Sequence, residues 1–497
     1  KMFDFIYNYK ENILFLVLIT PLIGSILILF TNQYNILRIK QLSLGFSLLT
    51  FNFSILLWLF FDSSSAKFQF VQKLNWIPFY NLNFYIGIDG ISLFFILLTT
   101  LLIPICLLSS WNSNKVYIKE YVLAFLIMES LLIAVFCVLD LLLFYIFFES
   151  VLIPMFIIVG LFGSRTRKIR AAFMFFLYTL FGSLFMLLAI LFIYSVTGTT
   201  DYQILLTTVF TEYQQKILWI AFFASFATKI PMLPVHIWLP EAHVEAPTEG
   251  SVILAGVLLK LGSYGFIRYS LPLFPFATLY FTPLINTLAV IGIIYTSLTA
   301  IRQTDLKRII AYASVAHMNL VMIGMFSLNI QGIEGSILQM ISHGIVSSSL
   351  FLCIGIIYDR HHTRLVKYYS GLVQTMPIYV TLFLFFTLAN IALPGTSSFI
   401  SEFLILFGIF QTNTTITFFA ATGMILGGIY SLWLFNRISF GNIRIQYFAE
   451  FADVTRREFY ILMPLAVITL IMGIFPDFFL EPMNVSVYNL IEHIRIQ

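Results

Sequence analysis

Five charged side chains lie inside stretches of this sequence that are otherwise apolar enough to span a membrane. They are three carboxylates and two amines: Glu129, Glu149, Glu402, Lys229 and Lys260. A charge at the centre of a bilayer costs about 2.5 to 3.5 kcal/mol even on insertion scales, whereas a whole domain is stable by only about 5 to 15 kcal/mol. These groups must therefore pair, contact internal water or change protonation, and each option indicates movement of protons or other ions.

Glu149 and Lys229 form the first candidate acid–base pair. At about 4 Å and an effective dielectric constant near 20, the attraction between two such charges is about 4 kcal/mol. That energy changes a proton equilibrium by about three orders of magnitude. Separating the two groups would therefore release the proton of Lys229, and the pair would act as a switch. The alternative is a structural salt bridge that never titrates.

Lys260 and two histidines are the candidate relay groups. Lys260 has no obvious counter-ion in its own predicted helix, so it is expected to be neutral for part of its cycle or to contact internal water. His317 and His343 lie in the middle of neighbouring spans, where the unperturbed histidine pKa of about 6.5 suits proton transfer. Both histidines could instead be satisfied packing residues. Glu129, one helix before Glu149, fits a hydrogen-bonded structural role or a place on the proton path.

No redox cofactor is predicted. Cys106, Cys137 and Cys353 are isolated in apolar stretches without a CxxC pair, which argues against an iron–sulfur cluster or a disulfide framework. His317 and His343 could face each other across a haem, but the sequence has no attachment motif or second ligand set. It also has no Walker loop, dinucleotide fingerprint or nucleophile motif. Proton transfer is the chemistry that remains.

One segment superficially resembles a metal site. Within residues 235–247, His243 lies between Glu241 and Glu245. The prolines of this segment and the nearby Trp238 predict a loop at the membrane surface instead, so no metal is expected.

The composition predicts an all-helical polytopic membrane protein. Hydrophobic residues make up 60% of the chain, charged residues make up 10%, and the mean hydropathy is +0.95. The apolar runs predict about fourteen membrane spans, at residues 13–30, 41–61, 91–109, 121–139, 141–162, 171–196, 217–239, 251–270, 277–300, 308–330, 334–358, 377–410, 416–436 and 460–478. The connections are short, and the longest, residues 62–90, shows no repeating pattern.

Two of these spans contain helix-breaking residues. Prolines 231 and 234 follow Lys229 in the seventh span, and Pro394 and Gly395 precede Glu402 in the twelfth. Because the breaks are five spans apart, spans 4–8 and 9–13 are expected to be two inverted five-helix repeats, an arrangement typical of transporters. The expected organisation is an N-terminal three-helix region (1–120), the two repeats (121–270 and 271–440), and a C-terminal helix and tail (441–497).

The distribution of basic residues predicts the orientation. Of the 27 Lys and Arg residues, 18 fall in loops on one side of the predicted spans and 7 on the other, with Lys229 and Lys260 inside the membrane. The positive-inside rule therefore places loop 163–170, with its four basic residues, on the inner side and both termini on the outer side.

Four segments carry a resemblance to a known family. They are KIPMLPVHIWLPEAHVEAPT (229–248), GSVILAGVLLKLG (250–262), DLKRIIAYASVAHM (305–318) and GTSSFISEF (395–403). Over about residues 90–440, the chain closely resembles the antiporter-like membrane subunits of respiratory complex I. Glu402 stands where related subunits of that family are expected to have lysine, which distinguishes one paralogue. Glu249 departs from the small residue expected at its position.

The resemblance implies a role for each candidate residue. It implies that Glu149 and Lys229 interact and that Lys260 is the central relay. It also implies that His317, joined by His343, is a connector and that Glu402 is the distal proton carrier. It also implies a subunit without a redox cofactor that works beside other membrane-arm subunits, neighbouring antiporter-like subunits above all, in the lipid of the mitochondrial inner membrane, with no nucleic-acid partner. Both termini would face the intermembrane space. Two alternatives stay open: an Mrp-type cation/proton antiporter subunit, and a structural scaffold subunit.

Overall fold

The computed structural model describes residues 2–113, 116–443 and 452–496, with side chains described from residue 12 onward. The chain divides into two compact units. The first comprises Lys1–Lys229, Lys260–Phe281 and Glu481–Gln497, and the second comprises Ile230–Leu259 and Thr282–Leu480. Each unit is built almost entirely of helices.

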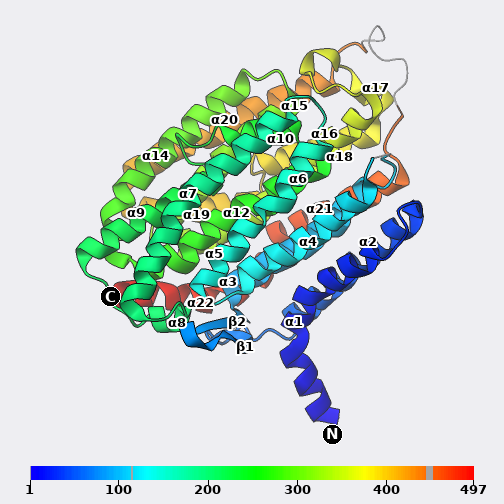
Figure 1. Ribbon diagram of the computed structural model, residues 1–497. Coiled ribbons are helices and arrows are strands. Elements are labelled where there is room, and N and C mark those ends of the chain that lie inside the picture. The colour runs from blue at the N-terminus through cyan, green and yellow to red at the C-terminus, as the bar shows by residue number, and fades with distance from the viewer. Residues whose placement is uncertain (1, 114–115, 444–451, 497) are drawn as a thin grey trace. The chain divides into compact units, whose positions relative to one another are not determined.

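The first unit begins with long helices and one hairpin. In Figure 1, α1 and α2, in dark blue, lie side by side, as do α3 and α4. Its elements are α1 (Met2–Leu29), α2 (Ile36–Leu59), β1 (Gln69–Ile77), η1 (Pro78–Tyr80), β2 (Leu82–Ile88), α3 (Gly90–Ser109), α4 (Ile118–Cys137), α5 (Leu141–Ser150), α6 (Leu152–Phe162), α7 (Lys168–Thr197), α8 (Tyr202–Leu205), α9 (Glu212–Lys229), α12 (Leu259–Gly265, from Lys260 onward), the π-helical η3 (Phe266–Ser270), α13 (Leu271–Leu273) and most of α22 (Asp477–Ile496).

The second unit is organised around one central helix. Every residue of α16 (Ile330–His361) from Gly332 to Ile357 is buried, and this helix packs against α15, α18, α19 and α21. The remaining elements are α10 (Trp238–Glu245), α11 (Thr248–Ile253), the π-helical η2 (Leu254–Leu258), most of α14 (Pro275–Ile301), α15 (Leu306–Met325), η4 (Val366–Tyr368), α17 (Leu372–Thr375), α18 (Pro377–Asn390), α19 (Ser397–Thr412), α20 (Thr414–Ser439) and α21 (Arg456–Ile474).

The predicted helical membrane fold is confirmed. Twelve helices among the described residues are long and apolar enough to cross a membrane, and two shorter apolar helices, Pro377–Asn390 and Ser397–Thr412, flank the predicted break in the twelfth span. The break in the seventh span is also present, between α9 and α10. The count of fourteen is not confirmed, because neither α9 nor the two shorter helices of the predicted twelfth span are among the twelve.

The starts of α5 and α15 are built in the same way. Asp140 and Asp305 each accept hydrogen bonds from backbone N–H groups in the first turn of the helix that follows. Each aspartate also lies in a short antiparallel bridge, Asp140 with Asp201 after α7 and Asp305 with Leu365 after α16. The same local arrangement therefore occurs once in each unit.

Three regions differ from the sequence-based expectations. The connection 62–90 contains an antiparallel β1–β2 hairpin. The sequence did not predict it, because apolar and polar residues do not alternate clearly in this segment. The prediction that residues 235–247 form a surface loop was wrong, because residues 238–245 form the buried helix α10. Pro240 is tolerated there because it lies in the first turn of the helix. Within that helix Glu241 pairs with Arg308 at 2.7 Å. The predicted C-terminal tail contains a further helix, α22.

Candidate functional site

Glu149 lies at an interruption caused by a proline. Pro154 has no N–H to donate to the carbonyl of Ser150, four residues earlier, so the apolar stretch divides into α5 and α6 at Val151. Glu149 is the penultimate residue of α5, where the last backbone carbonyls have no partner within the helix. The sequence therefore places this carboxylate beside carbonyl oxygens that can accept hydrogen bonds.

Lys229 occupies the last position of α9. The helix ends there because Pro231 follows, and the residue before a proline avoids the helical conformation. The buried Nζ donates to the carbonyl oxygen of Phe148 at 3.3 Å and lies 4.3 Å from the centre of the Phe148 ring. A cation is stabilised at a helix C-terminus and over an aromatic face. This position therefore suits a protonated lysine.

The two charged groups of this pair are close but not in direct contact. Lys229 and the Ser183 hydroxyl are the polar neighbours that act on the Glu149 carboxylate. Neither carboxylate oxygen has a partner at hydrogen-bond geometry in the described part of the chain, and Ser183 donates instead to the carbonyl of Leu180 at 2.9 Å. The predicted pair is thus present in an arrangement that we call open: the Lys229 ammonium is hydrogen-bonded to the backbone carbonyl of Phe148, the residue before Glu149, and not to the Glu149 carboxylate.

Lys260 is fully buried near the start of α12. This short helix lies between two π-helical segments, η2 and η3. Such segments are rare and are frequently found at functional sites. The predicted step from Lys260 to His317 leads from one unit to the other and stays a prediction.

Glu129 is held by a hydroxyl from α2. Thr50 Oγ1 lies 2.6 Å from Glu129 Oε1 and 2.7 Å from the carbonyl oxygen of Ser47. Because a hydroxyl has one hydrogen, Thr50 cannot donate to both oxygens at once. A protonated Glu129 that donates to Thr50 satisfies both contacts. The structure thus shows the hydrogen-bonded arrangement for Glu129. Among the residues that the structure describes, Glu129 makes no hydrogen bond or ion pair with another candidate residue.

His317 and Glu402 form the closest acid–base contact of the candidate site. His317 Nδ1 lies 3.2 Å from Glu402 Oε1, and the side chains are 13% and 4% exposed, respectively. Gln339 Nε2 lies 3.4 Å from each of the two atoms, and the Gln339 carbonyl accepts a hydrogen bond from Ser401. A single proton between the ring and the carboxylate is therefore held within hydrogen-bond distance of both.

Two further features surround this contact. The ring of His343 lies 5.7 Å from that of His317, centre to centre. On another side, a cavity of about 30 Å³ is lined by His317, Glu402, Asn390 and Tyr430, among others. Since one water needs about 10 to 15 Å³, this cavity has room for one or two waters with polar partners. Glu402 can thus exchange a proton with the ring or with water.

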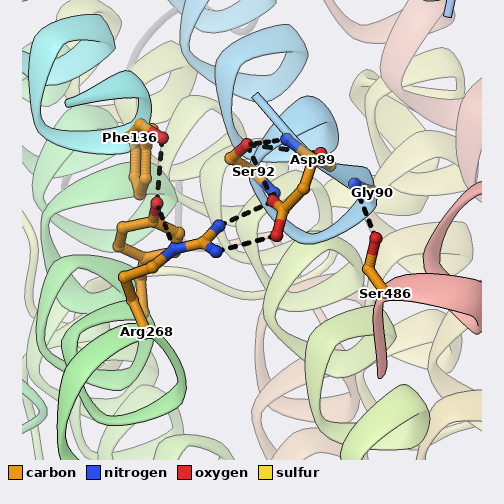
Figure 2. Close-up of polar contacts among 7 residues, drawn as sticks. Asp89, Gly90, Ser92, Phe136, Arg268 and Ser486 are labelled. Carbon is orange, nitrogen blue, oxygen red and sulfur yellow. Dashed lines mark hydrogen bonds and ion pairs between the residues drawn. The ribbon is translucent and has the colours of Figure 1, made fainter. Parts of the chain in front are cut away.

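Sequence reasoning missed several polar residues of these sites. Gln339 lies four residues before His343 on the same helix, and a polar residue at that spacing in an apolar span was a usable signal. Tyr430 gave no such signal, because tyrosines are common in this chain. Arg268 was not singled out near the end of the predicted span 251–270, yet it is buried in η3 and forms an ion pair with Asp89 (Figure 2).

Comparisons with known proteins agree with this architecture. Residues 138–429 match the family model described as NADH:quinone oxidoreductase/Mrp antiporter, TM. The NADH-ubiquinone oxidoreductase chain 4 of Marchantia polymorpha is 64% identical over 99% of each chain, and that of Arabidopsis thaliana is 65% identical over 96% of each.

Solved structures show the same fold. A chain of respiratory complex I from Thermus thermophilus with bound NADH has a TM-score of 0.87 at 29% identity and covers 96% of this chain and 99% of its own. A chain of an archaeal membrane-bound sulfane sulfur reductase has a TM-score of 0.84 at 22% identity, with 94% of this chain and 77% of its own covered. The second likeness concerns the fold alone.

Proposed function

The chain belongs to the NADH:quinone oxidoreductase/Mrp antiporter membrane family, and we propose that it is the chain 4 subunit of a proton-translocating NADH:ubiquinone oxidoreductase. Its similarity to chain 4 sequences over almost their entire length supports this assignment. The observation that carries the proton-transfer role is the buried His317–Glu402 contact, in which one proton can move between two groups 3.2 Å apart.

In the first unit, Glu149 and Lys229 act as a switch. In the open arrangement, the ammonium of Lys229 is held by the carbonyl and the ring of Phe148. Moving it toward Glu149 would add the attraction of an opposite charge and would raise its proton affinity. Moving it back would favour release of the proton. Redox events in other subunits supply the disturbance that drives this movement.

The released proton passes through Lys260 to His317 and leaves by way of Glu402. His343 is placed to exchange a proton with His317 through a short water chain, because the two ring centres are 5.7 Å apart. Gln339 is a positioning residue that keeps the His317 ring and the Glu402 carboxylate together. Glu129 is an accessory proton-holding group in this scheme. The subunit itself holds no redox cofactor.

The protein is a multi-pass membrane protein, and we place it in the mitochondrial inner membrane with both termini in the intermembrane space. The two chain ends, Lys1 and Gln497, lie outside the described residues. Its partners are other membrane-arm subunits, neighbouring antiporter-like subunits above all, together with lipid. The regions 1–120, 121–270, 271–440 and 441–497 are the proposed domains, with the central two as inverted repeats.

Protease accessibility in intact mitoplasts tests the orientation. Loop 163–170 carries Arg165, Arg167, Lys168 and Arg170, and we expect it to face the matrix. A protease added outside should therefore leave this loop intact and cleave it only after the membrane is opened. Cleavage in intact mitoplasts would reverse the proposed orientation.

Two alternatives are separated by other measurements. A free-standing Mrp-type antiporter predicts that the purified native complex lacks other respiratory subunits, which a mass-spectrometric inventory would reveal. A structural scaffold predicts that Lys229→Met impairs assembly without a selective effect on pumping. The proposed function predicts an assembled complex that contains quinone reductase subunits and whose pumping is lost in Lys229→Met.

A further inference from the structure

A buried ion pair lies at one end of the helix that carries Lys260. Arg268 Nη1 and Nη2 donate to the two carboxylate oxygens of Asp89 at 2.7 and 2.6 Å (Figure 2). Asp89 also caps α3 by accepting a hydrogen bond from the backbone N–H of Ser92 at 3.1 Å. The pair therefore fastens the start of α3 to η3 through two parallel charge-assisted hydrogen bonds, a geometry that is both strong and specific.

The remaining groups around this pair are also engaged. Arg268 Nε donates to Tyr264 Oη at 3.1 Å, and that hydroxyl donates to the carbonyl oxygen of Phe136 at 2.9 Å, the dashed chain at the left of Figure 2. The guanidinium carbon lies 5.3 Å from the centres of the Phe68 and Tyr264 rings. Three of the five guanidinium N–H groups are thus hydrogen-bonded to Asp89 and Tyr264. The guanidinium does not give up its proton, so Arg268 cannot relay a proton.

A cavity lined by both polar and apolar residues lies directly against the ion pair. It has a volume of about 110 Å³, enough for several waters, and its lining includes Asp89, Arg268, Ser486, Asn489 and His493. One of its lining residues, Asn489, is exposed at the surface. At its other edge, the backbone N–H of Gly90 donates to Ser486 Oγ at 3.1 Å, which attaches α22 to this end of α3.

Lys260 lies eight residues before Arg268 in the continuous helical stretch formed by α12 and η3. Tyr264 and Arg268 follow Lys260 at four-residue spacings, which place the three side chains along one helix face. Eight helical residues correspond to roughly 12 Å, so about three water molecules would bridge the distance from the cavity to Lys260 if the network opened. A proton held by Lys260 would then escape without contributing to transport along the relay.

We propose that the Asp89–Arg268 pair is a proton seal that separates Lys260 from the cavity beside α22. This inference rests on the proposed role of Lys260 as a proton carrier. A guanidinium does not release its proton, and a fixed positive charge in a narrow polar passage repels protons. The seal thus closes the passage both electrostatically and by occupying the hydrogen-bonding groups in it.

The ion pair persists at neutral pH. Burial by itself would raise the pKa of Asp89, but the adjacent Arg268 guanidinium outweighs burial and holds the pKa of this carboxyl below its ordinary value. Asp89 therefore stays ionised near pH 7, and the seal should be equally tight across the neutral range.

Passive proton permeability of the intact complex in proteoliposomes tests the seal. The probe is an imposed pH gradient without NADH, read by an entrapped fluorescent pH indicator. We expect Arg268→Met to raise the permeability at least about fivefold, because the positive charge and three hydrogen bonds are lost together. Lys73→Met is the matched control, since it breaks the partly exposed Lys73–Asp201 pair of the same unit and should leave the permeability unchanged.

A second variant decides the outcome if Arg268→Met fails to assemble. Tyr264→Phe keeps the ion pair and removes only the hydroxyl that links Arg268 to Phe136, so we expect about a twofold rise in permeability. An assembled Arg268→Met complex as tight as the parent would overturn the proposal. If Arg268→Met does not assemble, parent-like permeability in Tyr264→Phe would overturn it.

Addition of Lys260→Met separates this inference from the proposed function. The leak of Arg268→Met should disappear in the double variant, because Lys260 would no longer receive protons. A leak that persists would contradict a seal in front of Lys260. If Arg268→Met is tight while Lys260→Met alone still stops pumping, the seal is wrong and the proposed function stands.

Discussion

The two broken helices place an acid and a base at their interruptions in opposite order. In the first unit, α9 ends on the base Lys229, and the acid Glu149 comes from an earlier span. In the second unit, α19 carries the acid Glu402 in its second turn, and the base His317 comes from an earlier span. The interrupted helix therefore carries a basic residue, Lys229, in the first unit and an acidic residue, Glu402, in the second.

The contacts of the two pairs differ as much as their charges. His317 and Glu402 are 3.2 Å apart and share a neighbour in Gln339, whereas neither oxygen of Glu149 has a partner at hydrogen-bond geometry in the described part of the chain. A touching pair can pass one proton back and forth. A separated pair can change its proton affinity by moving. The first site is thus suited to control and the second to transfer.

The largest effect is expected at Lys260, the proposed relay group of the first unit. The account requires Lys260 to lose and regain a proton, and arginine keeps the charge but stays protonated. Lys260→Arg should therefore lower coupled ubiquinone reduction at least about tenfold, nearly as much as Lys260→Met. Both activities are measured with the assembled complex in membranes. If Lys260→Arg pumps normally and Lys260→Met does not, the positive charge of Lys260 is required but its proton exchange is not, and the proton takes another route.

A smaller but still large effect is expected at the second site. Glu402→Gln keeps the volume of the side chain but cannot carry a proton, so pumping should fall by about five- to tenfold in the assembled complex. Glu402→Asp is the matched control, because it keeps a carboxyl group and should retain part of the activity. Equal pumping in the glutamine variant and the parent would remove Glu402 from the path.

The smallest effect is expected from the group that positions this contact. Gln339→Leu removes the hydrogen bonds to His317 and Glu402 without removing either proton carrier, so a loss of about two- to threefold in turnover is expected. Gln339→Glu keeps a hydrogen-bonding group and provides the comparison. If Gln339→Leu were as damaging as Glu402→Gln, the amide would be part of the transfer path itself.

The sequence was most informative where a local signal decides the structure. Pro231, Pro234 and Pro394 remove backbone donors, and both interruptions could be predicted from them. A proline alone does not suffice as a signal, because Pro21 and Pro104 lie inside helices. The long apolar helices could likewise be predicted, from continuous runs of apolar residues. The helix α22 escaped prediction because its mixture of apolar and polar residues resembles a surface segment more than a span.

Contacts between distant residues could not be predicted in the same way. The sequence suggested that Glu149 and Lys229 pair, but the donation from Lys229 to the carbonyl of Phe148 depends on the relative position of α5 and α9. The role of Gln339 and the burial of Arg268 depend likewise on neighbouring helices. Side-chain partners across helices are set by tertiary packing, which no residue spacing encodes.

The contrast between a switching pair and a transferring pair is tested most directly by Glu149→Gln. The measurement is NADH:ubiquinone reduction together with the number of protons pumped per electron, in purified complex whose assembly has been verified. Glutamine has nearly the volume of the acid but cannot attract the ammonium of Lys229, so we predict an assembled complex with sharply reduced coupled turnover. Parent-like turnover and pumping in this variant would contradict the switch.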